Sequence, residues 1–198
     1  MRRRGAALEE AILQAAVEEL IEVGYRRLTM DSVAARAGTA KNVIYRRWPS
    51  RAALCIAAYR AQLPTGAEQA PDTGSLRGDA LALLTRANDR MSTPIGRALR
   101  EILADIQSDP ERLREIRDQI SRAGVSGWLT VMARAVSRGE VAPEVVTPRV
   151  ATVAVDLLRN EYALNGANAI PSSVLAEIVD EVFLPLTTRG QAPRRTPG

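Results

Sequence analysis

The residues best suited to chemistry lie in one short stretch, Thr29–Trp48, which reads TMDSVAARAGTAKNVIYRRW. Its second half carries an ammonium group, an amide, a phenol and a guanidinium group, on Lys41, Asn42, Tyr45 and Arg46. Cationic side chains bind the phosphates of a nucleic acid, and an Asn amide can form two hydrogen bonds with the edge of adenine. At helical spacing these four side chains share one outward face. We therefore expect this stretch to bind DNA, with a plain helical hairpin and a solvated basic face as the alternative.

Two short helices joined by a tight turn would position these groups. Thr29 can cap the first helix through its hydroxyl, and Gly38 can end it because glycine adopts the left-handed backbone conformation without strain. The small side chain of Ala34 would let the two helix axes approach closely. Inward apolar side chains would hold the hairpin on a core: Val33, Ala37, Val43 and Ile44. This combination predicts a helix-turn-helix whose second helix begins near Ala40.

A helix over residues 7–23 is predicted before the hairpin, because its apolar residues follow the helical period. Gly24 would end this helix, and Tyr25 is expected to pack beneath the hairpin. The last turns carry three carboxylates that we expect to form a solvated face, on Glu18, Glu19 and Glu22.

A helix over 51–63 is predicted after the hairpin, following Pro49 and capped by Ser50. Arg51 lies in its first turn, where backbone N–H groups and the guanidinium group could hold a DNA phosphate. Cys55 is expected in the core as a small apolar residue. With the hairpin and the preceding helix, this element completes a DNA-binding head over residues 1–63.

The positive charge of the chain is concentrated in this head. Residues 1–60 hold 11 basic and 6 acidic residues, a net charge of +5, whereas residues 61–198 hold 16 and 17, a net charge of −1. Such an asymmetry is typical of a nucleic-acid-binding domain. The arm Arg2–Arg4 could follow a phosphate strand or remain without a fixed partner.

Several kinds of chemistry are excluded by composition. The chain has no histidine, so His-based catalysis and the common zinc sites are not expected. No phosphate-binding glycine loop is present, and we expect neither enzymatic activity nor a cofactor or metal. The sequence has no apolar run of membrane-spanning length and no signal peptide, and its lone cysteine suits a reducing compartment. We therefore expect a cytoplasmic protein without a membrane association.

The rest of the chain is predicted to be a helical body. Residues 64–75, PTGAEQAPDTGS, have the composition of a linker. Helices are predicted over 76–91, 94–107, 110–122, 124–138, 147–165 and 172–187. Pro94, Pro110, Pro148 and Pro171 fall at their expected starts. The predicted fold is thus all-α, with the head at 1–63, the body at 76–187 and a disordered tail at 188–198.

Three segments of the head resemble the DNA-binding domain of the TetR family of bacterial transcriptional repressors: ILQAAVEELIEVGY, LTMDSVAARAG and KNVIYRRWPSRAAL. The resemblance covers about residues 7–60. It implies a homodimer in which each subunit joins a three-helix head to a larger body that binds a ligand and forms the dimer. Carried over by position, it implies DNA contacts by Lys41, Tyr45 and Arg46, and phosphate contacts by Thr29 and Arg51.

Four positions depart from the common pattern of that family. Thr39 replaces an apolar turn residue, and Ala40 replaces the usual Ser or Thr cap, so that Thr39 could take over the capping bond. Val43 stands where a hydroxyl commonly contacts phosphate, and is expected to pack or to touch a thymine methyl group. Asn42 stands where small residues are frequent, and is our candidate for reading a base.

The body offers residues for two further sites. Bulky apolar side chains of the middle helices could line a ligand pocket: Met91, Leu99, Leu103, Trp128, Met132 and Tyr162. The last two helices carry more apolar surface than one neighbour needs, which favours a partner helix from a second subunit, with a purely intrachain core as the alternative. The expected dimer contacts are Val153, Leu157, Val174, Ile178, Val182 and Phe183.

Together these observations predict a ligand-responsive DNA-binding regulator, a homodimeric repressor released from operator DNA by a small apolar effector. One alternative is a helical small-molecule-binding protein without specific DNA binding. Another is an architectural protein that binds DNA without sequence preference.

Overall fold

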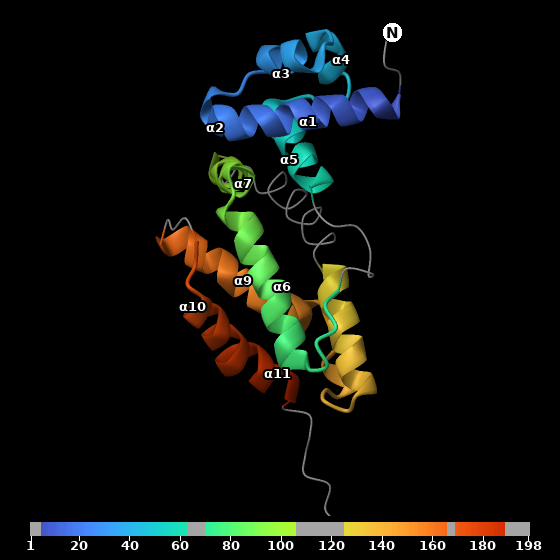
Figure 1. Ribbon diagram of the computed structural model, residues 1–198, viewed down its shortest axis with the longest axis vertical. Helices are drawn as coiled ribbons and strands as arrows, with labels where there is room; N and C mark the ends of the chain where they lie inside the picture. The colour runs from blue at the N-terminus through green and yellow to red at the C-terminus, as the bar shows by residue number, and fades with distance from the viewer. Residues whose placement is uncertain (1–4, 63–69, 106–124, 166–168, 189–198) are drawn as a thin grey trace, which may run out of the picture. The chain divides into compact units, whose positions relative to one another are not determined.

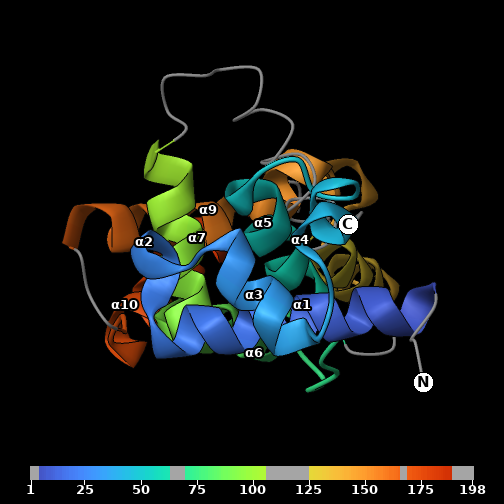
Figure 2. The same ribbon diagram turned by 90° about the horizontal axis from the view of Figure 1, so that it is seen from above.

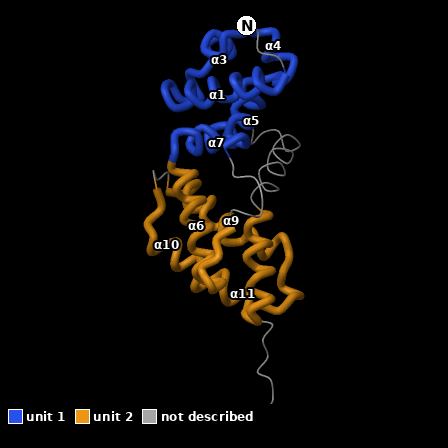
Figure 3. Tube along the Cα trace, turned by 45° about the vertical axis from the view of Figure 1, so that its right-hand side comes forward, with its two compact units in different colours: residues 1–63, 93–120 blue, residues 64–92, 121–198 orange. Residues whose placement is uncertain are grey.

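The computed structural model describes residues 5–62, 70–105, 125–165 and 169–188. Every regular element among these residues is a helix, which confirms the predicted fold class. The described residues form two compact units (Figure 3). The first contains residues 5–62 and 93–105, and the second contains residues 70–92 and those from 125 onward.

The first unit, the head, is built around α1 (Ala6–Glu22), which packs against α3 and α5 (Figures 1 and 2). Its remaining helices are α2 (Gly24–Arg27), α3 (Met30–Ala37), α4 (Lys41–Tyr45), α5 (Arg51–Ala61) and α7 (Pro94–Asp105). Aliphatic side chains at 0–1% exposure form its centre: Ile12, Leu20, Leu28, Val33, Ile44 and Leu54. Cys55 is also in this core, as predicted, and burial raises the pKa of its thiol to about 12.

One helix lies in a different unit from the one the sequence suggested. The stretch 94–107 was expected in the body, but α7 contacts α1, α2 and α5 of the head. Ala98, Leu99 and Ile102 recur at helical spacing on α7, and all three are buried in the core of the head. This apolar stripe is the physical reason for the packing, because the head offers the surface that buries it.

The second unit, the body, contains α6 (Leu76–Ser92), a helix over residues 125–137, the 3₁₀ turn η2 (Pro143–Val145), α9 (Pro148–Asn165), α10 (Ser172–Glu177), the π-helical turn η3 (Ile178–Phe183) and α11 (Leu184–Thr188). Its core includes an edge-to-face pair of Trp128 and Phe183, with ring centroids 5.3 Å apart. The helix starts at Pro94 and Pro148 are confirmed. Pro171 instead precedes α10 as its N-cap.

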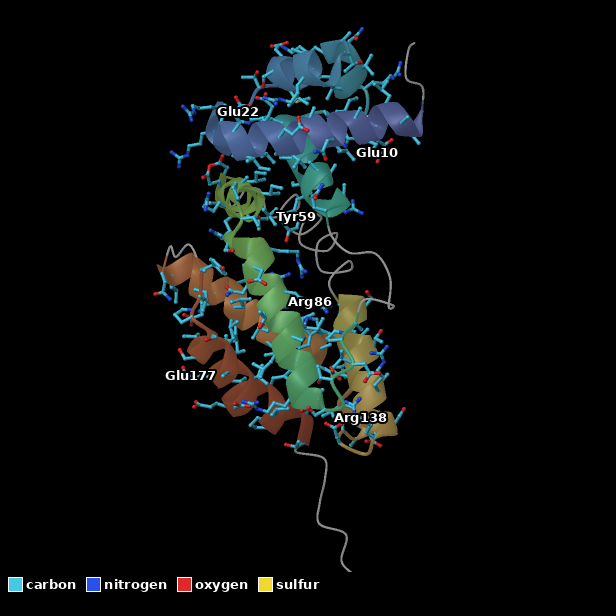
Figure 4. All side chains as sticks on the ribbon, viewed as in Figure 1. Glu10, Glu22, Tyr59, Arg86, Arg138 and Glu177 are labelled. Atoms are coloured by element: carbon cyan, nitrogen blue, oxygen red, sulfur yellow. The ribbon has the colours of Figure 1, made fainter. Side chains whose placement is uncertain are left out.

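Buried polar groups of the body are satisfied by one another. The Tyr162 hydroxyl lies 2.6 Å from Oδ1 of Asn88, and the Asn88 amide donates to the carbonyl of Ile170 at 2.9 Å. Near the start of α6, the fully buried Asp79 accepts a hydrogen bond from the Thr73 amide at 2.6 Å and pairs with Arg138 at 3.3 Å. Arg138 is labelled in Figure 4. The contacts of Asn88 and the Asp79–Arg138 pair join segments that lie far apart in the sequence.

The predicted helix 172–187 is interrupted by the π-helical turn Ile178–Phe183, where the amide of Leu184 bonds to the carbonyl of Val179. Pro185 follows immediately. A proline inside a helix has no N–H to donate and crowds the carbonyl four residues earlier, so the wider turn accommodates it.

Several predicted segments lie outside the described residues. They are the arm Arg2–Arg4, the helix 110–122 with Pro110, residues 64–69 of the linker, and the tail beyond Thr188. No helix in the described part of the chain is long and apolar enough to cross a membrane.

Candidate nucleic-acid interface

The first helix of the hairpin, α3, begins with a reciprocal cap. The hydroxyl oxygen of Thr29 accepts a hydrogen bond from the amide of Ser32 at 3.0 Å, and the amide of Thr29 donates to the Ser32 hydroxyl at 3.3 Å. Two backbone donors at the helix start are thereby involved in hydrogen bonds. Thr29 therefore has the predicted structural role, and because the residue is exposed its hydroxyl can still donate a hydrogen bond to a phosphate.

The turn between α3 and α4 depends on Gly38, which has the left-handed angles φ 64° and ψ 39°. The amide of Thr39 donates to the carbonyl of Ala34 at 3.0 Å and closes the end of α3. Ala40 precedes α4, and no side-chain cap bond is found there in the described residues. The expectation that Thr39 would supply this bond is therefore wrong, because Thr39 lies in the turn that ends α3.

The second helix, α4, turns Ile44 inward at 0% exposure, and Val43 is half-buried beside it. Its exposed side, extended by the C-cap residue Arg46, carries the four side chains expected to contact DNA: Lys41, Asn42, Tyr45 and Arg46. Tyr45 is 43% exposed, so its aromatic ring is available for contact. An exposed aromatic ring flanked by cations suits a groove lined with phosphates and base edges.

The two cations of α4 differ in their surroundings. The Lys41 ammonium lies 2.7 Å from Oδ2 of Asp31, on α3, and 5.9 Å from the centre of the Tyr45 ring. The hydrogen bond to Asp31 raises the pKa of Lys41. The Arg46 side chain forms no ion pair or hydrogen bond with any residue in the described ranges. Arg46 can therefore bind a phosphate without breaking an existing contact.

Arg51 is engaged inside the head. Its guanidinium group donates to the carbonyls of Arg26 and Leu28 at 3.2 and 3.3 Å, and its central carbon lies 4.3 Å from the centre of the Tyr25 ring. These contacts hold the segment that leads into Thr29. The predicted phosphate contact of the Arg51 side chain would compete with them. The cap of α5 is as predicted, with the Ser50 hydroxyl accepting from the amide of Ala53 at 3.1 Å.

Of the three glutamates of α1 expected to be solvated, Glu18 and Glu22 are exposed and Glu19 is buried. Arg36, on α3, pairs with Glu19 at 2.8 Å, with Glu18 at 3.5 Å and with Glu22, which can be located in Figure 4. Glu19 is only 7% exposed. The expectation is wrong for Glu19 alone, because α3 and its arginine cover that residue. The helical spacing of the three carboxylates was the one sequence signal of a shared cationic partner.

The expected pocket residues do not share one environment. Trp128, Met132 and Tyr162 are buried in the core of the body, and Met91 packs at its edge. Leu99 and Leu103 instead belong to the cluster of the head. This division follows from α7 lying in the head.

The expected dimer residues divide by burial. Phe183 and Ile178, at 0% and 7% exposure, already lie in the core of their own chain. Half-buried side chains provide the remaining apolar surface: Val153, Leu157, Val174 and Val182.

A capped helix, a left-handed glycine turn and a short exposed helix with aromatic and cationic groups define a helix-turn-helix DNA-binding protein. Comparisons with known proteins agree. Residues 12–58 match the family described as "Bacterial regulatory proteins, tetR family". Residues 70–182 match "Tetracyclin repressor-like, C-terminal domain".

Individual relatives extend this similarity over nearly the whole chain. The "DNA-binding transcriptional repressor TetR" of Mycobacteroides abscessus is 31% identical, over 94% of this chain and 97% of the relative. The "HTH-type transcriptional regulator AqdR" of Rhodococcus erythropolis is 28% identical, over 91% of this chain and 86% of its own. The solved TetR family regulator SCO0332 aligns with a TM-score of 0.72 and 25% identity, over 89% of this chain and 96% of the other. The chain belongs to the TetR family and is a DNA-binding transcriptional regulator, from a family whose members are not enzymes.

Proposed function

We propose that the protein is a homodimeric repressor that leaves its operator when a small apolar effector binds the body. The observation that carries the DNA-binding part is the exposed side of α4, where Asn42 and Tyr45 lie beside the cations Lys41 and Arg46. Repression is supported by the relative from Mycobacteroides abscessus, which is named a transcriptional repressor. The protein would act in the cytoplasm, where bacterial DNA is found.

Dimerisation is supported by the half-buried apolar side chains of α9, α10 and η3. Val153, Leu157, Val174 and Val182 are only half-buried, and the first three pack on the core of the body. A second copy would remove their remaining exposed surface from water. A twofold dimer would set two α4 helices about 34–36 Å apart, or a multiple of one DNA turn, so the operator should be a near-palindrome.

The effector class is inferred from the composition of the body. Its core is mostly aliphatic, with Trp128, Met132, Tyr162 and Phe183 as the large or flexible members and the Asn88–Tyr162 pair as a buried polar group. Such an environment favours an apolar or aromatic molecule with few polar groups. An effector weakens DNA binding only if it binds the DNA-incompetent state more tightly, typically by a factor of about 5–150.

The experiment that tests specific DNA binding is selection from a pool of random-sequence duplexes. We expect a near-palindromic operator, bound at least about 1000-fold more tightly than a random duplex of the same length. Equal binding of both duplexes would support the architectural alternative. No binding of either, with a folded protein, would support the small-molecule-binding alternative.

The effector is tested by reciprocity. An apolar compound library screened by thermal shift should yield a ligand that stabilises the protein. Titration calorimetry should then show weaker ligand binding to the operator complex than to the free dimer, by the same factor as the ligand weakens operator binding. A ligand that binds both forms equally would contradict release by an effector while leaving DNA binding intact.

A further inference from the structure

Lys41 and Asp31 form an ion pair between the two helices of the hairpin, at the side expected to meet DNA. Lys41 is the first residue of α4, and Asp31 lies in the first turn of α3. The ammonium nitrogen and the carboxylate oxygen are 2.7 Å apart. Both side chains are open to solvent, at 47% and 68% exposure. A carboxylate therefore occupies, in the free protein, the position beside Lys41 that a DNA phosphate would need.

This arrangement has an energetic consequence for DNA binding. An exposed ion pair is weak, so a phosphate can displace the carboxylate. The displaced Asp31 cannot move far, because the first turn of α3 and the cap at Thr29 hold its backbone. Its negative charge would then remain near the phosphates, at a separation over which screening by salt is incomplete. Arg46, one turn further along, has no such competitor among the described residues.

We propose that Asp31 is an intramolecular competitor of DNA phosphate that restrains the affinity of α4 for any duplex through Lys41. The proposal rests on the proposed function, in which the exposed side of α4 meets DNA. Asp31 also stabilises α3, because a carboxylate in the first turn interacts favourably with the helix dipole. The same negative charge thus stabilises the start of α3 and competes with a DNA phosphate for Lys41.

The test compares wild type with Asp31→Asn, using the selected operator and a random duplex of equal length. Asp31→Asn should bind both duplexes about 2–30-fold more tightly, the range expected when two exposed ion pairs per dimer no longer compete. The slope of log affinity against log salt should steepen by up to about 0.9 per subunit, the value for one phosphate. Asp31→Ser, which also suits a helix start, serves as a second variant if Asp31→Asn is unstable.

Two controls separate this effect from a general change in charge. Glu10→Gln removes one carboxylate from α1, at an exposed residue that has no ion pair in the described part of the head (Figure 4), and gives the general charge effect. In a Lys41→Met background, the gain from Asp31→Asn should shrink toward the Glu10→Gln effect, because only the direct repulsion between Asp31 and the phosphates remains. An unchanged gain in that background would overturn the proposal.

The direction of the change in DNA affinity also tests the proposal. If the pair instead prearranges Lys41 for DNA, Asp31→Asn would weaken binding, and the proposal would be wrong. Failure of the inference is distinguishable from failure of the proposed function. If wild type selects no operator, the function itself fails. If wild type selects an operator and Asp31→Asn binds it with wild-type affinity and salt slope, only the role of Asp31 is refuted.

Discussion

Arg46 and Arg51 carry the same charge five residues apart, but their surroundings assign them different roles. Arg46 is exposed and has no partner among the described residues, whereas the guanidinium group of Arg51 donates to the carbonyls of Arg26 and Leu28 and stacks on Tyr25. A cation that neutralises a phosphate contributes to the salt dependence of binding. A cation that holds the protein backbone contributes to affinity without that dependence.

Arg46→Ala should therefore weaken binding to all duplexes and reduce the salt slope by about 0.9 for each phosphate that is no longer neutralised, or about twice that per dimer. Arg51→Met should lower the melting temperature and the operator affinity while leaving the slope near that of wild type. Fluorescence anisotropy over a range of salt concentrations measures the affinity and the slope, and a thermal melt measures the stability. A reduced slope with unchanged stability in Arg51→Met would restore the phosphate interaction that the sequence suggested.

A second prediction at the scale of single residues concerns pH. Nε and Nη2 of Arg77 each lie 2.7 Å from an oxygen of Asp180, and this lowers the pKa of Asp180 below its ordinary value of 3.8. A carboxyl group whose pKa is lower in the folded state stabilises the fold above its unfolded pKa, and loses that contribution as the pH falls below it. Asp180→Asn should thus be less stable than wild type at neutral pH, and the difference should diminish below about pH 4.

Denaturant unfolding between pH 2.5 and 7 measures this difference. Glu177→Gln is the matched control, because it removes an exposed carboxylate from the adjacent α10 without breaking an ion pair of the described residues (Figure 4). A destabilisation of Asp180→Asn that stays constant down to pH 2.5 would show that the carboxylate charge is not its cause.

At the scale of elements, two glycines test whether the turn of the hairpin requires a glycine: Gly38 lies in that turn, and Gly127 lies in a helix of the body and serves as the comparison. Gly38 has φ +64°, and a Cβ there would meet no atom within 4 Å, so backbone strain is the sole cost of a side chain. Gly127 lies in the helix 125–137 without a positive φ, and a Cβ there would lie 3.6 Å from Cδ2 of Leu83, an ordinary contact.

Gly38→Ala should consequently destabilise the protein by about 1–2 kcal/mol. Gly127→Ala should stabilise it by up to about 1 kcal/mol, because alanine loses less backbone entropy in a helix. Unfolding in denaturant measures both changes. If both variants moved in the same direction, the assigned backbone conformation of one glycine would be incorrect.

Local signals predicted the hairpin well, because caps and turns depend on neighbouring residues. Thr29, Gly38 and Ser50 have the conformations or bonds expected of them. The Arg36 pairs with α1 were missed because they join residues 14–18 positions apart, and a solvated face and a covered face have the same sequence pattern. The short helix α2 and the π-helical turn before Pro185 were missed for a related reason. Each is a small departure from the predicted helix pattern, and the sequence fits the predicted and the observed forms almost equally well.

At the scale of the whole molecule, the assignment of α7 was the main error. A linker composition over 64–75 suggested a single boundary, whereas the chain returns to the head at residues 93–105. Whether a helix packs on the head or on the body depends on which surface buries its apolar stripe, and no pattern of neighbouring residues encodes that. The pocket residues suggested from sequence were divided between two cores for the same reason.

The dimer is tested by a charge on the remaining apolar surface. Val182→Asp should convert the dimer to a monomer and abolish operator binding, because Val182 is only half-buried in its own chain and the new carboxylate would be desolvated between subunits. Ile21→Asp is the control, since Ile21 is 56% exposed and lies on α1 of the head, outside the proposed interface. Sedimentation at micromolar concentration gives the mass of each. A wild-type monomer would contradict the dimer directly.

The buried, protonated Cys55 makes site-selective labelling practicable. It is the only cysteine in the sequence, it is 1% exposed, and its pKa of about 12 leaves almost no thiolate at neutral pH. A maleimide or nitroxide reagent would therefore react with a cysteine introduced at the exposed Glu10 and leave Cys55 unmodified. One spin label per subunit would then report the head-to-head separation in solution, with operator and with effector, against a background of unlabelled native thiol.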